Sequence, residues 1–186
     1  MHDHADHIEH IIVLLERTPG TLDELLRGLP PEWTDRNEGG DSWSPREVVA
    51  HLSHAERTEW IAHILEHGES RPFPRFNREG GRASMHKSMA ELLDEFAAVR
   101  AESIGKLRGL ALSADDMGRH STHEVLGTVT LAELLTTWAA HDISHLHQIT
   151  RCMAYNLREG VGPFHRFLGV MKCSAHSEQN PKQARP

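Results

Sequence analysis

Apolar residues recur at spacings of three and four in several long stretches of this chain, which is the spacing of one face of an α-helix. The clearest stretch runs from Thr130 to Met153, where Thr130 and Glu133 form a capping box, the usual signature of a helix start. Its apolar face includes Leu131, Leu134, Leu135, Trp138, Ile149 and Cys152. We therefore predict a long helix over residues 130–153.

Three other long stretches show the same spacing. They predict helices over residues 4–17, 44–67 and 88–107. The second of these begins at Ser44–Glu47, where a capping serine, a proline at the first helical position and a glutamate at the third coincide. A short helix is predicted over residues 21–29, and Pro19 is expected to separate it from the helix before it.

The segments between these helices carry Pro and Gly without helical spacing. Residues 68–84 form a long connection, and loops of this length inside a compact domain tend to be functional or mobile. Residues 111–129 are irregular, with room for a short extended turn around residues 123–130, and a short apolar piece follows at residues 164–171. No stretch alternates with strand spacing for long enough to build a sheet.

These patterns predict an all-α fold, an antiparallel four-helix bundle with one or two short extra helices and a long loop at about 68–84. A length of 186 residues suits a single domain with a real core. We place this domain at residues 1–172 and expect residues 173–186 to form a disordered tail.

Net charge and composition indicate which kinds of molecule this protein binds. The chain has 27 acidic and 20 basic residues, a formal net charge of −7, which disfavours a surface for nucleic acid or for an anionic membrane. We interpret its basic loop as a lid or a dimer contact, formed by Arg71, Arg75, Arg78 and Arg82. No segment approaches the ~18 apolar residues of a membrane span, and the start lacks the pattern of a signal peptide. We expect a cytoplasmic protein that binds a small molecule.

Histidine is unusually abundant, with 16 residues. His141 and His145 lie one helical turn apart, so their rings point the same way and can supply two ligands to a metal ion. A catalytic site needs a third ligand and a free position, and His51 is the best candidate because it shares a helix side with the apolar residues Val48, Ala55 and Ala62. Zinc, nickel and iron suit such a set equally. In a chain this rich in histidine such spacing also arises by chance, and we interpret His63 and His67 as a solvated pair.

Other polar residues surround this candidate site. Asp142 falls within an apolar stripe and must find a partner, so it either orients a ligand histidine or ties its helix to a neighbour; we favour a tie near the backbone of Trp43. Gln148 is a second candidate for orienting a ligand. Glu59 is a weak candidate for a catalytic proton acceptor, and the catalytic residues are otherwise unassigned. Cys152 is interpreted as a core thiol.

Two sets of residues match a known family. The first set is Trp43, Ser44, Pro45, Val48, Val49, Ala50, His51, Leu52 and Glu56, and the second is Leu126, Gly127, Thr130, Leu131, Leu134, Leu135, Trp138, Ala139, Ala140, His141, Asp142, His145, Gln148 and Ile149. Over about residues 8–153 the chain resembles the DinB-like superfamily, the metal-binding DinB/YfiT group. The resemblance implies a four-helix bundle with a divalent metal ion held by His51, His141 and His145, and a homodimer, as in many relatives. It also implies transfer of low-molecular-weight thiols to electrophiles, or hydrolysis.

The leading hypothesis is therefore a metal-dependent enzyme of the thiol S-transferase or hydrolase type that acts on a small molecule. In such an enzyme the ion lowers the pKa of a bound thiol or water and so makes a nucleophile at neutral pH. The alternative is a non-catalytic metal-binding or stress-associated bundle protein, in which the ion only stabilises the fold. The sequence leaves both open.

Overall fold

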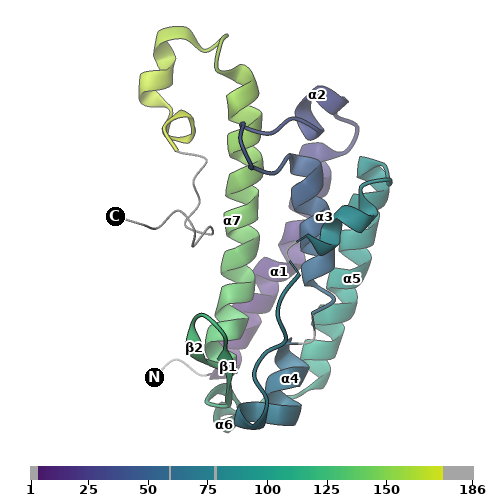
Figure 1. Ribbon diagram of the computed structural model, residues 1–186, viewed down its shortest axis with the longest axis vertical. Coiled ribbons are helices and arrows are strands. Elements are labelled where there is room, and N and C mark those ends of the chain that lie inside the picture. Colours follow the sequence, from purple (N-terminus) through teal and green to yellow (C-terminus); the bar gives the residue numbers. More distant parts are fainter. Residues whose placement is uncertain (1–3, 59, 78, 174–186) are drawn as a thin grey trace.

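The computed structural model describes residues 4–58, 60–77 and 79–173, and within these ranges the chain forms a bundle of four long helices (Figure 1). They are α1 (His4–Leu26), α3 (Pro45–Ala55), α5 (Met89–Gly109) and α7 (Leu131–Leu157). The last of them, α7, has 27 residues and spans most of the height of the bundle. The all-α fold class is confirmed.

Shorter elements connect these helices or follow the last of them. The helical ones are α2 (Pro31–Thr34), α4 (Trp60–His67), α6 (Ala114–Met117) and the 3₁₀ helices η1 (Gly68–Ser70), η2 (Gly80–Ser84), η3 (Gly162–Phe167) and η4 (Gly169–Met171). The strands β1 (His120–His123) and β2 (Gly127–Thr130) form an antiparallel hairpin in which Ser121 lies opposite Val129. The hairpin lies where the sequence predicted only an irregular segment with a short extended turn.

The inward face of α7 joins two clusters of buried apolar side chains. At its start Leu131 and Leu135 pack with residues of α1, α4 and α5, whereas Ile149 near its end packs with α1, α3 and α5. Burying each such side chain contributes about 1.5–3 kcal/mol. These contacts place the middle of α7, with its two candidate ligands, against α3.

The predicted end of the first helix at Pro19 is wrong, because α1 continues through this residue. Proline has no N–H, so the carbonyl of Leu15 loses its helical partner. The buried guanidinium of Arg100, on α5, donates a hydrogen bond from Nη1 to this carbonyl at 2.9 Å. A tertiary contact thus replaces the missing helical bond, and the sequence around Pro19 carries no sign of it.

The predicted helix over residues 44–67 is also corrected, because it divides into α3 and α4. Two side chains donate hydrogen bonds to carbonyls at the break. Thr58 donates from Oγ1 to the carbonyl of Ala55 at 2.7 Å, and Arg57 donates from Nη1 to that of Ser53 at 2.8 Å. At the end of α3 the side chain of Glu56 is buried and pairs with Arg100. The break therefore brings a carboxylate into the core.

None of the helices in the described ranges is long and apolar enough to cross a membrane. The apolar piece expected at residues 164–171 forms η3 and η4, with Phe164 and Phe167 exposed. The predicted disordered tail lies outside the described residues except for Cys173, which is exposed.

Cys152 is fully buried, as predicted for a core thiol, and its Sγ donates a hydrogen bond to the carbonyl of Trp43 at 3.4 Å. Burial, with a smaller contribution from the charge of Glu38, raises the pKa of this thiol to about 11. At pH 8 roughly 0.1% of it is then thiolate, the reactive form. We expect a disulfide reagent to label Cys173 within minutes in the native protein and Cys152 only after denaturation.

The control for this labelling is the Cys173→Ser variant, whose native form should show no fast-reacting thiol. Two thiols of equal reactivity in the native protein would contradict the burial of Cys152.

Candidate metal centre

The first candidate ligand is positioned by the start of α3. Ser44 caps this helix, with its Oγ accepting a hydrogen bond from the backbone N–H of Glu47 at 3.3 Å, while the Glu47 carboxylate accepts one from the backbone N–H of Ser44 at 2.8 Å. Pro45 occupies the first turn. A cap of this kind contributes about 1 kcal/mol and fixes where the helix begins. His51 consequently lies on the buried side of α3 and is 5% exposed.

The other two candidate ligands come from the middle of α7. This helix starts at the predicted capping box of Thr130 and Glu133. His141 and His145 follow on one side of it, with ring centroids 4.3 Å apart. His145 is 1% exposed and His141 is half-buried. The pair therefore lies at the margin of the core, facing α3.

The three imidazoles meet at their Nε2 atoms. The Nε2 atom of His141 lies 3.2 Å from that of His51 and 3.0 Å from that of His145. Two nitrogens that each lie about 2.0–2.1 Å from a tetrahedral ion are about 3.3 Å apart. The spacing thus fits one divalent ion between the three rings. Within the described part of the chain this is the one group of three or more His, Cys, Asp or Glu side chains close enough to hold a metal ion.

Burial favours the neutral, metal-binding form of His141. The pKa of His141 lies below its ordinary value, chiefly because burial disfavours the charged imidazolium; the nearby Asp142 carboxylate opposes this shift and the Arg100 guanidinium adds to it. A neutral imidazole has a free lone pair for a metal ion, so this shift favours binding of a cation by His141.

Gln148 contacts the ring of His145. Its Oε1 lies 2.9 Å from Nδ1 of His145. With the proton on Nδ1, this nitrogen donates to the amide oxygen, and the lone pair remains on Nε2, the atom that faces the other two rings.

Asp142 ties α7 to its neighbour, but not at the predicted place. Instead of the backbone near Trp43, its partner is Arg100 of α5, whose Nη1 and Nη2 donate to the two carboxylate oxygens at 2.5 and 2.9 Å. The same guanidinium pairs with Glu56 at 2.8 Å, and the indole N–H of Trp138 donates to Glu56 at 2.8 Å. We call Glu56, Arg100 and Asp142 the buried charge cluster. It joins α3, α5 and α7 directly beside His141.

Aromatic rings enclose the candidate centre. The ring of Trp43 lies 4.6 Å from that of His51 and is stacked on His145 at 6.2 Å, while Phe76 meets His51 edge-on at 5.7 Å. The loop that carries Trp43 is held on α7 by the buried ion pair of Glu38 with Arg151. Such packing restricts the ligand rings to their converging positions.

His63 and His67 do not join the centre. His63 and His67 lie half-buried at the side of α4, where a ring nitrogen of His63 lies 2.9 Å from the carbonyl of Arg71. Glu59, the weak candidate for a proton acceptor, lies outside the described residues. The sequence reasoning assigned no role to Glu56 or Arg100, although Arg100 lies four residues from both Phe96 and Ile104, at a core position of α5.

Comparison with known proteins agrees with this geometry. A family model of the DinB superfamily matches residues 14–149, most of the bundle and all three histidines. The chain belongs to the DinB superfamily. The resemblance inferred from the sequence is thereby confirmed over most of its length.

A solved member of similar shape supports the DinB fold. It is YfiT from Bacillus subtilis, described as a probable metal-dependent hydrolase with an unusual four-helix bundle topology. The two structures agree with a TM-score of 0.66 at 19% sequence identity, over 83% of this chain and 89% of YfiT. No match was found among curated proteins.

Proposed function

We propose that this DinB protein is a divalent-metal-dependent enzyme, a hydrolase or a thiol S-transferase, acting on a small molecule. The observation that carries the proposal is the convergence of three imidazoles, in which Nε2 of His141 lies 3.2 Å from Nε2 of His51 and 3.0 Å from Nε2 of His145. Three protein ligands leave a coordination position for water or for a thiol, the arrangement of catalytic rather than structural zinc sites. The description of YfiT as a probable hydrolase supports the first of the two reaction types.

The chain's own residues hold and orient the reacting groups in this proposal. A divalent ion, when bound, lowers the pKa of the water or thiol that it holds. Gln148 keeps the His145 lone pair on Nε2, and the buried charge cluster fixes α7 next to His141. Trp43 and Phe76 limit the access of bulk water to the rings, which strengthens electrostatic interactions there.

A non-catalytic role is the second candidate, and one observation favours it. The pocket that His51 lines has a volume of about 10 Å³, room for about one water molecule. A pocket of this size beside His51 admits no organic substrate, which favours an ion that only stabilises the bundle. The proposed enzyme, in contrast, must open this pocket to admit an organic substrate.

Activity of the zinc-loaded, untagged protein distinguishes the two candidates. We expect it to accelerate either hydrolysis of small esters and amides or conjugation of a small thiol to an electrophile. His145→Ala should reduce that rate at least about a hundredfold, because the site loses a ligand. His147→Ala, an exposed histidine of the same helix, should leave the rate within about twofold. A protein that binds zinc but accelerates neither reaction would contradict the proposal and favour the non-catalytic role.

A further inference from the structure

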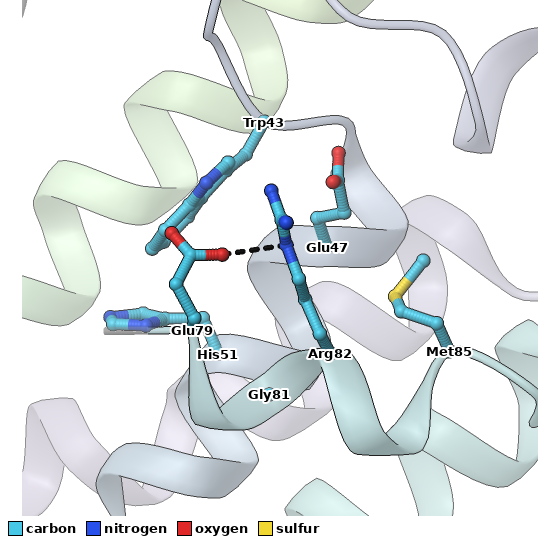
Figure 2. A pocket seen from close by; sticks show the side chains of 7 residues that line it. All are labelled: Trp43, Glu47, His51, Glu79, Gly81, Arg82 and Met85. Atoms are coloured by element: carbon cyan, nitrogen blue, oxygen red, sulfur yellow. Dashed lines mark ion pairs between the residues drawn. The ribbon is translucent and has the colours of Figure 1, made fainter. Parts of the chain in front are cut away.

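One wall of the pocket beside the candidate metal centre comes from η2, a segment with no helical spacing in the sequence. The pocket is lined by Trp43, Glu47, His51, Glu79, Gly81, Arg82 and Met85. It therefore connects a candidate metal ligand with a charged segment of the long loop. Figure 2 shows Arg82 rising from η2 into the space between Trp43 and Glu47.

Two glycines allow η2 to pack directly against α3. A Cβ atom on Gly81 would lie 2.8 Å from the backbone carbon of Ala50, and one on Gly80 would lie 2.2 Å from the ring of His54. These distances are shorter than any packed carbon contact. Only glycine permits this approach at Gly81, where the obstacle is backbone, and the approach fixes the position of Arg82 one residue later.

The carboxylate of Glu79 pairs with one edge of the Arg82 guanidinium. An ion pair joins Glu79 Oε2 to Arg82 Nε at 2.6 Å, drawn as the dashed line in Figure 2. Neither Nη atom of Arg82 donates a hydrogen bond to any residue in the described ranges. The guanidinium thus keeps its outer, two-nitrogen edge available, and this edge matches the two oxygens of a carboxylate.

The other charged groups of the pocket are carboxylates, which limit the charge of an anion that Arg82 can bind. Among the seven lining residues Arg82 is the cation, whereas the Glu47 carboxylate already accepts hydrogen bonds from Ser44. Two carboxylates in the pocket wall disfavour a dianion such as phosphate, because like charges repel. The side chain of Arg82 is 68% exposed, so it lies at the rim, where one end of a metal-bound molecule would emerge.

We propose that Arg82, oriented by Glu79, binds a carboxylate group of the substrate whose reacting atom lies at the metal ion. The inference rests on the proposed function and specifies its substrate class, small molecules that carry a carboxylate. Arg82 is in this proposal a specificity-determining residue, which acts on binding and not on the bond that reacts.

Binding of simple thiols to the cobalt-loaded protein tests this inference without any turnover. The probes are mercaptoacetate, 3-mercaptopropionate and 4-mercaptobutyrate, each compared with its neutral amide, so that chain length covers the span from ion to rim. The sulfur-to-cobalt charge-transfer band reports binding. We expect at least one acid to bind about tenfold or more tightly than its amide, since a charged bidentate contact is strong. Arg82→Gln should reduce this preference to within about twofold, and Glu79→Gln should reduce it in part.

Arg75→Gln is the matched control, an arginine of the same loop whose side chain is 87% exposed, and it should keep the full preference. Equal binding of acids and amides by the native protein, or a preference that survives Arg82→Gln, would overturn the inference and leave the metal centre standing. Bound cobalt without a charge-transfer band for any thiol would overturn thiol binding at the ion, and this inference with it. Failure of cobalt to bind would overturn the proposed function itself.

Discussion

Arg100→Leu is expected to lower the free energy of unfolding by about 3–5 kcal/mol, the largest effect on stability that the structure indicates. The substitution leaves the carboxylates of Glu56 and Asp142 buried without their cation, and the carbonyl of Leu15 without its donor. Although burial acts to lower the pKa of Arg100, the hydrogen bonds and charges of Asp142 and Glu56 raise it above its ordinary value. The guanidinium therefore stays charged inside the protein. Urea denaturation followed by circular dichroism measures the change.

Arg108→Leu is the matched control for this experiment. Arg108 lies on the same helix, and its ion pairs with Glu9 and Glu16 are about half exposed. Exposed pairs contribute about 0–1 kcal/mol, so this variant should change stability little. A loss for Arg100→Leu no greater than that for Arg108→Leu would contradict the role assigned to the buried charge cluster.

His51→Ala is expected to weaken zinc binding at least about a hundredfold. Structural zinc sites gain about 10–16 kcal/mol from four ligands, which is about 2.5–4 kcal/mol for each one. His51 is the ligand that α3 supplies, so its removal also uncouples the metal ion from that helix. Competition with a chelating indicator dye measures the affinity.

Two further variants serve as comparisons for His51→Ala. His147→Ala removes an exposed histidine of α7 and should leave the zinc affinity unchanged within about twofold. Gln148→Ala should have an intermediate effect of about 10–100-fold, because it removes the partner of His145 but no ligand. Equal affinities for the native protein and His51→Ala would show that zinc binds elsewhere.

Local signals in the sequence predicted much of the fold and the three converging histidines. The capping boxes at Ser44 and Thr130 fixed the starts of α3 and α7. Helical spacing then placed His51 on a buried side of its helix and His141 at the edge of an apolar stripe. Such signals act within one or two turns, so a single sequence reveals them.

The features that sequence reasoning missed depend on contacts between distant segments. The continuation of α1 through Pro19 depends on Arg100, which lies 85 residues from the carbonyl that it satisfies. The break after Ala55 accompanies the burial of Glu56 in the same cluster. A charged residue at a core position of α5 was the available hint, because a buried arginine requires carboxylate partners.

The wall formed by η2 was missed for another reason. Gly80 and Gly81 read as loop residues in the sequence, where they indicate flexibility and not close packing. Their role depends on the backbone of α3 at Ala50, which only the folded chain brings near. The position of Arg82 beside the candidate centre follows from this contact.

The most direct test is to locate the metal ion in the untagged protein by anomalous X-ray diffraction, with elemental analysis of the same sample. We predict one divalent ion per chain, bonded at about 2.0–2.1 Å to the Nε2 atoms of His51, His141 and His145. Protein that has been exposed to zinc and carries no ion between these rings, or carries it at His63 and His67 instead, would contradict the account.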